Sequence, residues 1–477
     1  MTTVYVLLAF FILLMIVLIT RTIYFKETFQ HKTCKVVKFD EDHAVESLKA
    51  MIKFKTISHV EKEKIDPVPF ENFIHYLTVR YKTIMAQAEM IRVEPMGVIF
   101  KIKGASDEQP SVLMSHFDVV PENGEWEHDP FLGEIVEDAI YGRGTLDTKG
   151  TLCAVMESVE HHLKKGYLFK QDVYLCFSGD EEVYGHSAKN IVEYLDQKGI
   201  HPSLVLDEGG AVVKDIFPGI KQSIAVIGIT EKGVLSVELK AHASGGHAAM
   251  PPKETAVTEL AKAIRQLNKP KHFKLTLTEG VIKMFNTVTK YSKSFAIRMI
   301  FANLWLFSPL VKKMAKSSGG ELLSLMKTTQ AFTMMQGSEA INVLPSEAKV
   351  GINYRLLTGQ TSEKTINKIK KVIKNDAIEV TPLYVSEPPP LSHCDQHYQK
   401  IVETIEETFE DTIATPYLMM ATTDSRHYHQ ISENVYRFSP MRLSKEALKT
   451  IHGVNEKVPK AVFLECVKFY INLLKKL

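Results

Sequence analysis

Three apolar runs that each end in polar or charged residues decide the fold: SVLMSHFD at residues 111–118, DVYLCFSGDEE at 172–182 and SLVLDEGG at 203–210. Their length and their content of Val, Leu and Phe are typical of buried strands. Between the first two lies GTLCAVMESVEHHLKKG (150–166), whose apolar residues recur at helical spacing and whose Gly166 is suited to a helix C-cap. Strands that alternate with helices predict an α/β fold, with a mostly parallel mixed sheet covered by helices on both faces.

The composition indicates a globular protein of one large or two ordinary domains. The chain has 477 residues, of which 45% are apolar and 24% charged, so it has the material for a substantial core. Its 58 basic residues nearly balance 56 acidic ones, and no basic patch indicates nucleic-acid binding. The 5 widely spaced cysteines form no C-x-x-C pair, which argues against a disulfide framework or a cysteine-ligated zinc module and predicts free thiols.

The N-terminal region contains an uninterrupted apolar segment, VYVLLAFFILLMIVLI, at residues 4–19. It is near the lower limit of the roughly 17–25 residues that span a bilayer, and neighbouring threonines extend it. No basic residue precedes it and no small-x-small cleavage site follows it, so we expect a single-pass membrane anchor that is not cleaved. The basic residues that follow, from Arg21 to Lys38, place the body in the cytosol by the positive-inside rule.

Candidate metal ligands stand where the predicted strands end. His116 and Asp118 point to the same side of the first strand, so Asp118 can brace the imidazole nitrogen that does not bind metal. The other candidates are Asp147 in YGRGTLDTKG before the helix, Glu181 and Glu182 after the second strand, and Asp207 after the third. Each of these features alone is usually incidental or a solvated turn. Together, at the ligand-binding edge of one sheet, they favour a metal site.

A second domain of α+β type is predicted as an insertion. Residues 234–243 alternate as a strand does, residues 251–267 form a helical pattern, and residues 347–357 predict another strand. The expected organisation is a membrane anchor and juxtamembrane segment over 1–37, a catalytic domain over 38–232 and 359–477, and an inserted lid and dimerisation domain over 233–358. The bounds follow from the pattern, whereas the roles as catalytic domain, lid and dimerisation domain are those that a family resemblance of seven motifs along the chain implies.

Part of the insertion, between residues 281 and 335, is unusually apolar and rich in Met and Phe. The ordinary interpretation is the core of added lid helices. The functional alternative is a channel for a long acyl chain, or a surface that lies against the membrane.

Seven motifs, in order, resemble those of the co-catalytic dizinc amidohydrolases, a superfamily that includes aminoacylase, carboxypeptidase S, carboxypeptidase G and succinyl-diaminopimelate desuccinylase. The resemblance extends from about residue 40 to the C-terminus and is greatest to the branch of carboxypeptidase S and N-fatty-acyl-amino acid synthase/hydrolase. The motifs are SHFDVVP (115–121), YGRGTLDTKG (141–150), GDEE (179–182), VLDEGG (205–210), SGGHAAMPP (244–252), INVLP (341–345) and IHGVNE (451–456).

The resemblance implies a site with two Zn²⁺ ions per subunit. Asp147 would bridge them, His116 and Asp207 would complete one ion's ligands, and Glu182 and His452 the other's. His452 is preferred to His427 and His429 because IHGVNE matches the metal-binding motif better. The further implied roles are Asp118 orienting His116, Glu181 as general base, His247 stabilising the oxyanion, and Asn342, Arg355 and Arg426 binding the substrate.

The implied function is zinc-dependent hydrolysis of the amide bond of an N-acyl amino acid, including fatty-acyl forms, or of a small peptide. A metal-bridging hydroxide would attack the amide carbonyl while Glu181 moves the proton. The alternative enzyme is a carboxypeptidase or dipeptidase, and the rival class is a membrane-tethered binding protein on a hydrolase scaffold. A homodimer through the lid is expected, and the resemblance favours an extracytoplasmic body, against the positive-inside count.

Overall fold

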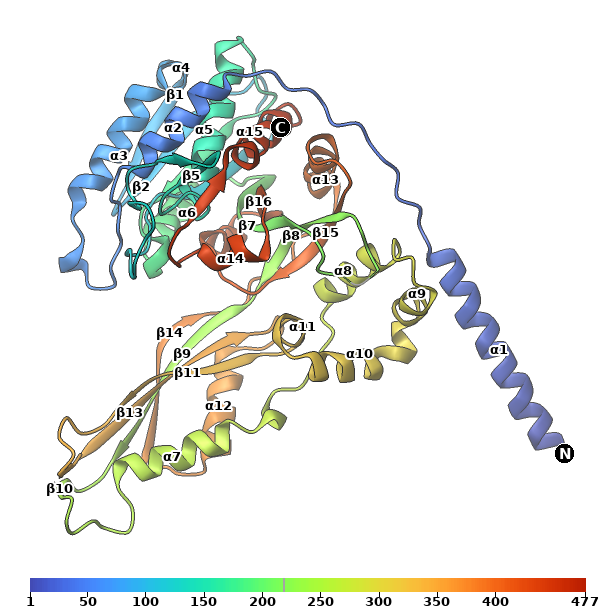
Figure 1. Ribbon diagram of the computed structural model, residues 1–477, viewed down its shortest axis with the longest axis vertical. Coiled ribbons are helices and arrows are strands. Elements are labelled where there is room, and N and C mark those ends of the chain that lie inside the picture. The colour runs from blue at the N-terminus through green and yellow to red at the C-terminus, as the bar shows by residue number, and fades with distance from the viewer. Residues whose placement is uncertain (218) are drawn as a thin grey trace.

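The computed structural model describes residues 1–217 and 219–477, and Figure 1 shows a helix-covered sheet above a smaller elongated lid. The main sheet has the strand order β1-β2-β6-β3-β7-β16-β8-β15. Strands β6, β3, β7 and β16 run parallel, as do β8 and β15, whereas β1 and β2 add an antiparallel edge. The predicted α/β class with a mostly parallel mixed sheet is confirmed. The strands are β1 Ala88–Val93, β2 Gly97–Ile102, β3 Ser111–His116, β6 Val173–Ser178, β7 Leu204–Val213, β8 Ser223–Glu231, β15 Thr412–Met419 and β16 Val435–Arg442.

Helices cover both faces of this sheet because its strands are apolar on both sides. Leu113 and Leu175 face the core that includes α5, whereas Val112 and Cys176 face the core that includes α6. Alternate strand residues therefore bury into opposite layers. The first layer contains α2 Glu41–Ile52, α3 Pro67–Arg80, α4 Lys82–Gln87, α5 Lys149–Lys164, α13 Gln396–Thr408 and α15 Lys460–Leu474, and the second contains α6 Ser187–Gln197 and the short helix η4 Asp424–Gln430.

A small three-stranded sheet carries the loops beside the strand ends. Its strands are β4 Ile135–Val136, β5 Ala139–Tyr141 and β17 Lys457–Pro459, in the order β17-β5-β4. The pairing of β5 with β17 brings the YGRGTLDTKG loop next to the IHGVNE loop, although more than 300 residues separate them in the chain. The short helix α14, Lys445–Thr450, leads into the second loop.

The lid is a four-stranded antiparallel sheet with the order β11-β13-β9-β14. It extends past the predicted boundary at residue 358, because β14 pairs with β9 and brings residues 378–386 into the lid. The lid strands are β9 Gly233–His242, β11 Thr329–Gln336, β13 Glu347–Leu356 and β14 Ile378–Ser386, with β10 Gly246–His247 paired to β12 Val343–Leu344 at the far tip, and the lid helices are α7 Ala256–Leu267 and α12 Ser362–Ile373.

The chain enters and leaves the lid at one place. β9 begins at Gly233, directly after β8, and β14 ends beside it at Ser386. A Cβ atom on Gly233 would lie 2.5 Å from the carbonyl oxygen of Ser386 and 2.6 Å from Pro388. The two connecting strands are therefore in direct backbone contact at this hinge.

Four helices of the insertion leave the lid sheet and pack on the main domain. They are α8 Glu279–Thr289, α9 Phe295–Ala302, α10 Leu304–Ser318 and α11 Gly320–Leu325. Their inner residues, such as Phe285 and Val311, share a core cluster with Leu418 of β15. The apolar residues on the inner face of these helices therefore form a core, as the first interpretation of residues 281–335 predicts.

The apolar N-terminal segment forms a single helix, α1, Thr2–Phe25. Within the described residues it is the one unbroken helix long and apolar enough to cross a membrane, and α9 with α10 meets that test only as a pair bent by 113°. After α1 the chain runs extended along the body to α2 (Figure 1).

Candidate metal centre

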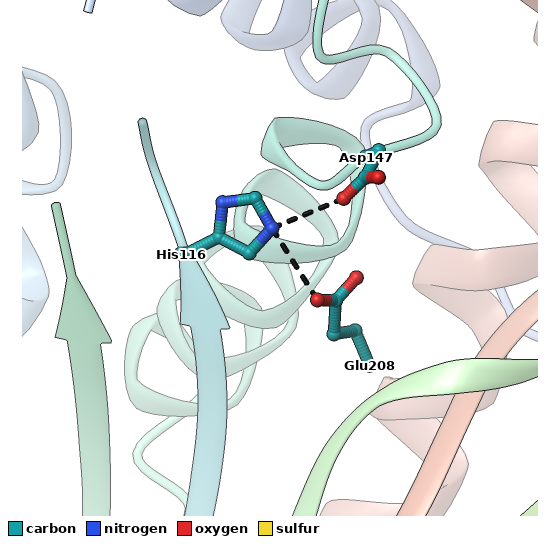
Figure 2. A group of neighbouring side chains, drawn as sticks. All are labelled: His116, Asp147 and Glu208. Atoms are coloured by element: carbon teal, nitrogen blue, oxygen red, sulfur yellow. Dashed lines mark hydrogen bonds and ion pairs between the residues drawn. The ribbon is translucent and has the colours of Figure 1, made fainter. Parts of the chain in front are cut away.

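The first group of candidate ligands surrounds the end of β3. The Nε2 atom of His116 lies 3.0 Å from Asp147 Oδ1 and 3.3 Å from Glu208 Oε1, and Figure 2 shows both carboxylates converging on that nitrogen. His116 is almost fully buried at its strand end. These three side chains offer ligand atoms within 4.8 Å of one another, which fits one metal ion.

The second group shares Asp147 with the first. His452 Nε2 lies 3.0 Å from the other oxygen of Asp147, Oδ2, and 3.0 Å from Glu182 Oε2. Asp147, Glu182 and His452 again offer ligand atoms within 4.8 Å of one another. Asp147 therefore directs one oxygen to each group, which is the arrangement of a carboxylate that bridges two metal ions.

Asp118 connects the first group to the loop after β6. Its carboxylate lies 3.3 Å from Nδ1 of His116 and accepts hydrogen bonds from the backbone N–H groups of Glu181 and Glu182, both at 3.1 Å. The nitrogen of His116 that faces away from the ligand group is thus held by Asp118 and its carbonyl oxygen. This fixes the ring orientation, as expected for a residue behind a metal ligand.

The structure brings Glu208, rather than Asp207, to His116. Asp207 is buried and accepts a hydrogen bond from the backbone N–H of Ser425 at 3.0 Å. The cause is a register shift: Arg437 of β16 pairs with Asp207 and Phe438 pairs with Gly210, so residues 208 and 209 bulge out of the ladder. A bulge re-aims the side chains it contains. The predicted ligand Asp207 thus belongs to neither ligand group, and Glu208 is the carboxylate that faces His116.

Burial and crowding perturb the acids of the site. Burial raises the pKa of Glu181 well above its ordinary value, and the nearby carboxylates of Asp424 and Glu208 add to this. Burial and the charge of Asp147 raise the pKa of Glu208 to about 8. Several carboxylates gathered in a buried space are unfavourable without cations to neutralise them. The donor set of imidazole nitrogens and carboxylate oxygens fits two zinc ions.

A buried ion pair fixes the loop that carries Asp147. One oxygen of Glu456 accepts the backbone N–H groups of Gly144 at 3.1 Å and Leu146 at 2.8 Å, and the other accepts from Arg143 at 2.7 Å. Glu456 follows His452 by four residues, so this carboxylate ties the two ligand loops together. Nothing in sequence spacing singled out this pair.

Two predicted substrate-binding residues meet at the loop after β15. Arg426 is 92% shielded from solvent, donates to the carbonyl oxygen of Thr423 at 2.6 Å and has a buried Nε with no hydrogen-bond partner within the described chain. It lies over the ring of Tyr184, two residues beyond Glu182. Arg355 reaches the same loop from the lid, where its guanidinium is 3.5 Å from the Thr422 hydroxyl.

The other two predicted lid residues stand elsewhere. His247 and Asn342 lie together at the exposed tip of the lid, where the Asn342 carbonyl accepts a hydrogen bond from the backbone N–H of Ala248. Figure 1 places this tip, marked by β10, far from β7 and β16 of the main sheet. Within one subunit, neither residue lies beside the candidate ligands.

The two histidines that were alternatives to His452 as a metal ligand, His427 and His429, are in η4, next to α6. His427 is largely buried and its Nε2 has no hydrogen-bond partner within the described residues, whereas His429 accepts from Arg437 at 3.3 Å. Neither belongs to the two ligand groups. The 5 cysteines are free, and Cys153, Cys176 and Cys466 are buried.

Comparison with known proteins shows the family of the chain. The family model described as Peptidase family M20/M25/M40 matches residues 112–476. The chain is 34% identical to a probable carboxypeptidase S-like protein 2 of Dictyostelium discoideum, over 88% of this chain and 82% of the relative. It is also 34% identical to the N-fatty-acyl-amino acid synthase/hydrolase PM20D1 of Xenopus tropicalis, over 90% of this chain and 85% of the relative.

Solved structures share the fold. The M20 family metallo-carboxypeptidase Sso-CP2 from Sulfolobus solfataricus aligns with a TM-score of 0.68 at 19% identity, covering 92% of this chain and 99% of the other. The Bacillus subtilis YXEP protein, titled a dinuclear metal binding peptidase from the M20 family, aligns with a TM-score of 0.56 at 11% identity, covering 92% and 99%. The chain therefore belongs to peptidase family M20/M25/M40 and is a hydrolytic enzyme.

Proposed function

We propose that the protein is a membrane-anchored dizinc amidohydrolase that cleaves the amide bond of N-acyl amino acids, including fatty-acyl ones. The observation that carries the proposal is the position of Asp147, whose two carboxylate oxygens face two separate ligand groups. His116 and Glu208 would hold one zinc ion with Asp147, and Glu182 and His452 the other. When bound, the ions would polarise the amide carbonyl and lower the pKa of water between them.

Glu181 would be the general base of this reaction. It is buried and adjacent in sequence to the ligand Glu182, and its backbone N–H donates to Asp118. Its carboxyl group is near enough to His116 and Glu208 to interact with their charges, but it belongs to neither ligand group. A carboxylate there accepts the proton of the attacking water and returns it to the leaving nitrogen.

The amino acid part of the substrate would be held by its carboxylate. Arg426 is a buried guanidinium with an unpaired Nε beside Tyr184, and the Arg355 side chain approaches the same loop from the lid. A guanidinium binds a carboxylate with two parallel hydrogen bonds. Similarity to PM20D1, whose name gives fatty-acyl amino acids, supports an acyl chain as the other half.

A carboxypeptidase or dipeptidase is the second candidate. The same carboxylate recognition by Arg426 would select the C-terminus of a peptide, and similarity to a probable carboxypeptidase S-like protein supports it. The two candidates differ in what lies on the acyl side of the scissile bond.

Membrane attachment would come from α1 retained as an anchor. Leu18 and Thr22 of α1 are buried against the body, and Arg21 donates to the carbonyl oxygen of Ala302 at 3.0 Å. A helix with such tertiary contacts is part of the folded protein, which supports retention over cleavage. Alkaline extraction of membranes tests this directly, because a spanning protein stays in the pellet.

The test of the function is release of free amino acid from N-acetyl, N-palmitoyl and N-oleoyl amino acids and from dipeptides, with and without zinc. We expect zinc-dependent turnover with preference for long acyl chains. The Glu181→Gln variant should lose at least about 100-fold in kcat while keeping both metal ions, because it removes only the proton acceptor. Metal content measured on the same samples is the control, and full activity of Glu181→Gln would refute the assignment. Preference for dipeptides would favour the second candidate.

A further inference from the structure

The helices α9 and α10 present an apolar face to solvent, although they belong to an otherwise well-packed body. Trp305 is 58% exposed and Met314 48% exposed. Leu306, Leu310 and Met314 recur every four residues, so they form one stripe along α10. Val311 and Ala315, on the adjoining face about 100° round the helix, are buried in the core. The α10 helix therefore has two apolar sides, one against the protein and one without a partner in the described chain.

This exposed stripe is next to the end of the membrane anchor. Arg21 donates to Ala302 at the end of α9, and Asn303, between α9 and α10, donates to the carbonyl oxygen of Leu18 at 3.3 Å. Figure 1 shows α9 beside the C-terminal end of α1. The apolar run of α1 ends at residue 19, so these contacts are at the level where a spanning helix leaves the hydrocarbon.

The anchor is also fixed relative to the body. Beyond α1, the backbone N–H of Glu27 donates to the carbonyl oxygen of Lys290 at 3.1 Å, and their side chains form an ion pair. Lys35 pairs with Glu407 at 2.7 Å. A tether held at both of these points does not let the body rotate freely away from the bilayer.

The region around α10 is positively charged, which suits a surface of anionic lipids. From residue 280 to residue 320 the sequence has no Asp or Glu, and Lys312, Lys313 and Lys316 lie on α10. Basic residues near a membrane are attracted to anionic headgroups, and Trp is enriched at the interface. The bend of 113° between α9 and α10 excludes one continuous spanning rod and suits helices lying along the surface.

We propose that α9 and α10 form a second membrane contact that lies in the headgroup region of the bilayer spanned by α1. The partner is a lipid bilayer containing anionic lipids. The apolar stripe of α10 enters the boundary between headgroups and acyl chains, and the three lysines bind phosphates. The inference rests on the proposed anchoring by α1 and is independent of the catalytic proposal.

The test uses the full chain reconstituted in vesicles of equimolar phosphatidylcholine and phosphatidylglycerol with acyl chains brominated near the headgroup. The protein has 2 tryptophans, Trp126 and Trp305. In the Trp126→Phe variant only Trp305 reports, and we expect bromine to remove most of its emission. The Trp305→Phe variant, which reports only Trp126 in the catalytic domain, should keep its emission. The difference between wild type and Trp305→Phe gives the same answer if Trp126→Phe folds poorly.

Charge reversal supplies a matched comparison. The combined Lys312→Glu, Lys313→Glu and Lys316→Glu substitutions should reduce the quenching of Trp305. The same change at three exposed lysines of α12, Lys364, Lys370 and Lys371, should leave it unaltered.

The outcomes separate the two proposals. A chain that resists alkaline extraction but shows no quenching of Trp305 keeps the anchor and overturns the second contact. Release of the chain at alkaline pH refutes anchoring by α1, and it also refutes the second membrane contact, which depends on that anchoring. Equal loss of quenching in both lysine variants overturns the role of α10's lysines as the lipid contact.

Discussion

Glu208 faces His116 where Asp207 was predicted to do so, and this difference can be tested by substitution. If Glu208 is the ligand, Glu208→Gln should lose one of two bound metal ions and most activity, because an amide is a weaker ligand than a carboxylate. Asp207→Asn should keep both ions, because an amide oxygen still accepts the Ser425 N–H. Metal analysis of the two purified variants checks this. Loss of metal in Asp207→Asn alone would restore the original assignment.

Four of the five predicted metal ligands lie in the two ligand groups, and Asp207 does not. His116, Asp147, Glu182 and His452 gather as the strand-end argument and the family resemblance predicted. The family resemblance implied Asp207, and the regular alternation of a strand does not indicate that a bulge turns Glu208 toward His116 instead. The one available signal was the pair of glycines that follows, since Gly209 has φ +133°.

The strand β14, which lies beyond the predicted end of the lid at residue 358, was also not predicted from the sequence. Residues 378–386 alternate as a strand does, but Pro382 lies in the middle, and a proline argues against a central strand. β14 accommodates it as the edge strand of the lid, with a register shift between Pro382 and Tyr384. The predicted strands 234–243 and 347–357, which lack such an interruption, correspond to β9 and β13.

The hinge between main domain and lid predicts a position-specific effect of one side chain. Gly233→Val should destabilise the protein by about 1–3 kcal/mol, because its side chain would push β9 away from Ser386 and Pro388. Gly246→Val at the lid tip is the matched control, since nothing lies within 4 Å of a Cβ there. Urea unfolding of both variants measures the difference. Equal stability of the two would show that the hinge backbone adapts.

The buried side chain of His427 makes the free energy of unfolding of the protein depend on pH. Burial lowers the pKa of His427 to about 3, against about 6.5 in an unfolded chain. Between those values the unfolded state binds the extra proton, so stability is complete above pH 6.5 and falls as the pH drops. This group alone should cost about 2 kcal/mol between pH 7 and pH 5.

Comparing His427→Gln with wild type isolates that contribution. The variant's loss of unfolding free energy on acidification should be smaller by the same amount, whereas His75→Gln, an exposed histidine on α3, should follow wild type. Urea titrations at the two pH values give the measurement. Parallel pH profiles for all three proteins would contradict the prediction.

The position of His247 predicts shared sites between subunits. It lies in β10 at the lid tip, far from β7 and β16 of its own main sheet (Figure 1), so a role on the oxyanion requires the site of a second copy. Glu181→Gln and His247→Ala should each be inactive alone. Mixed subunits should recover about a quarter of wild-type activity, because half of the dimers have one intact site. A mixture that remains inactive, with exchange verified by native mass spectrometry, would refute this.

The adjacent ends of the lid also have a bearing on how such a chain arises. Because Gly233 and Ser386 are neighbours, the 233–386 segment interrupts the main sheet at a single point, between β8 and the segment leading to α13. Its gain or loss would leave the spacing of every flanking strand unchanged. A gene encoding the sheet alone could therefore acquire the lid in one recombination event. A hydrolase without the segment would need a short turn to close the gap and another cover for Leu418 of β15, which α8–α11 bury here.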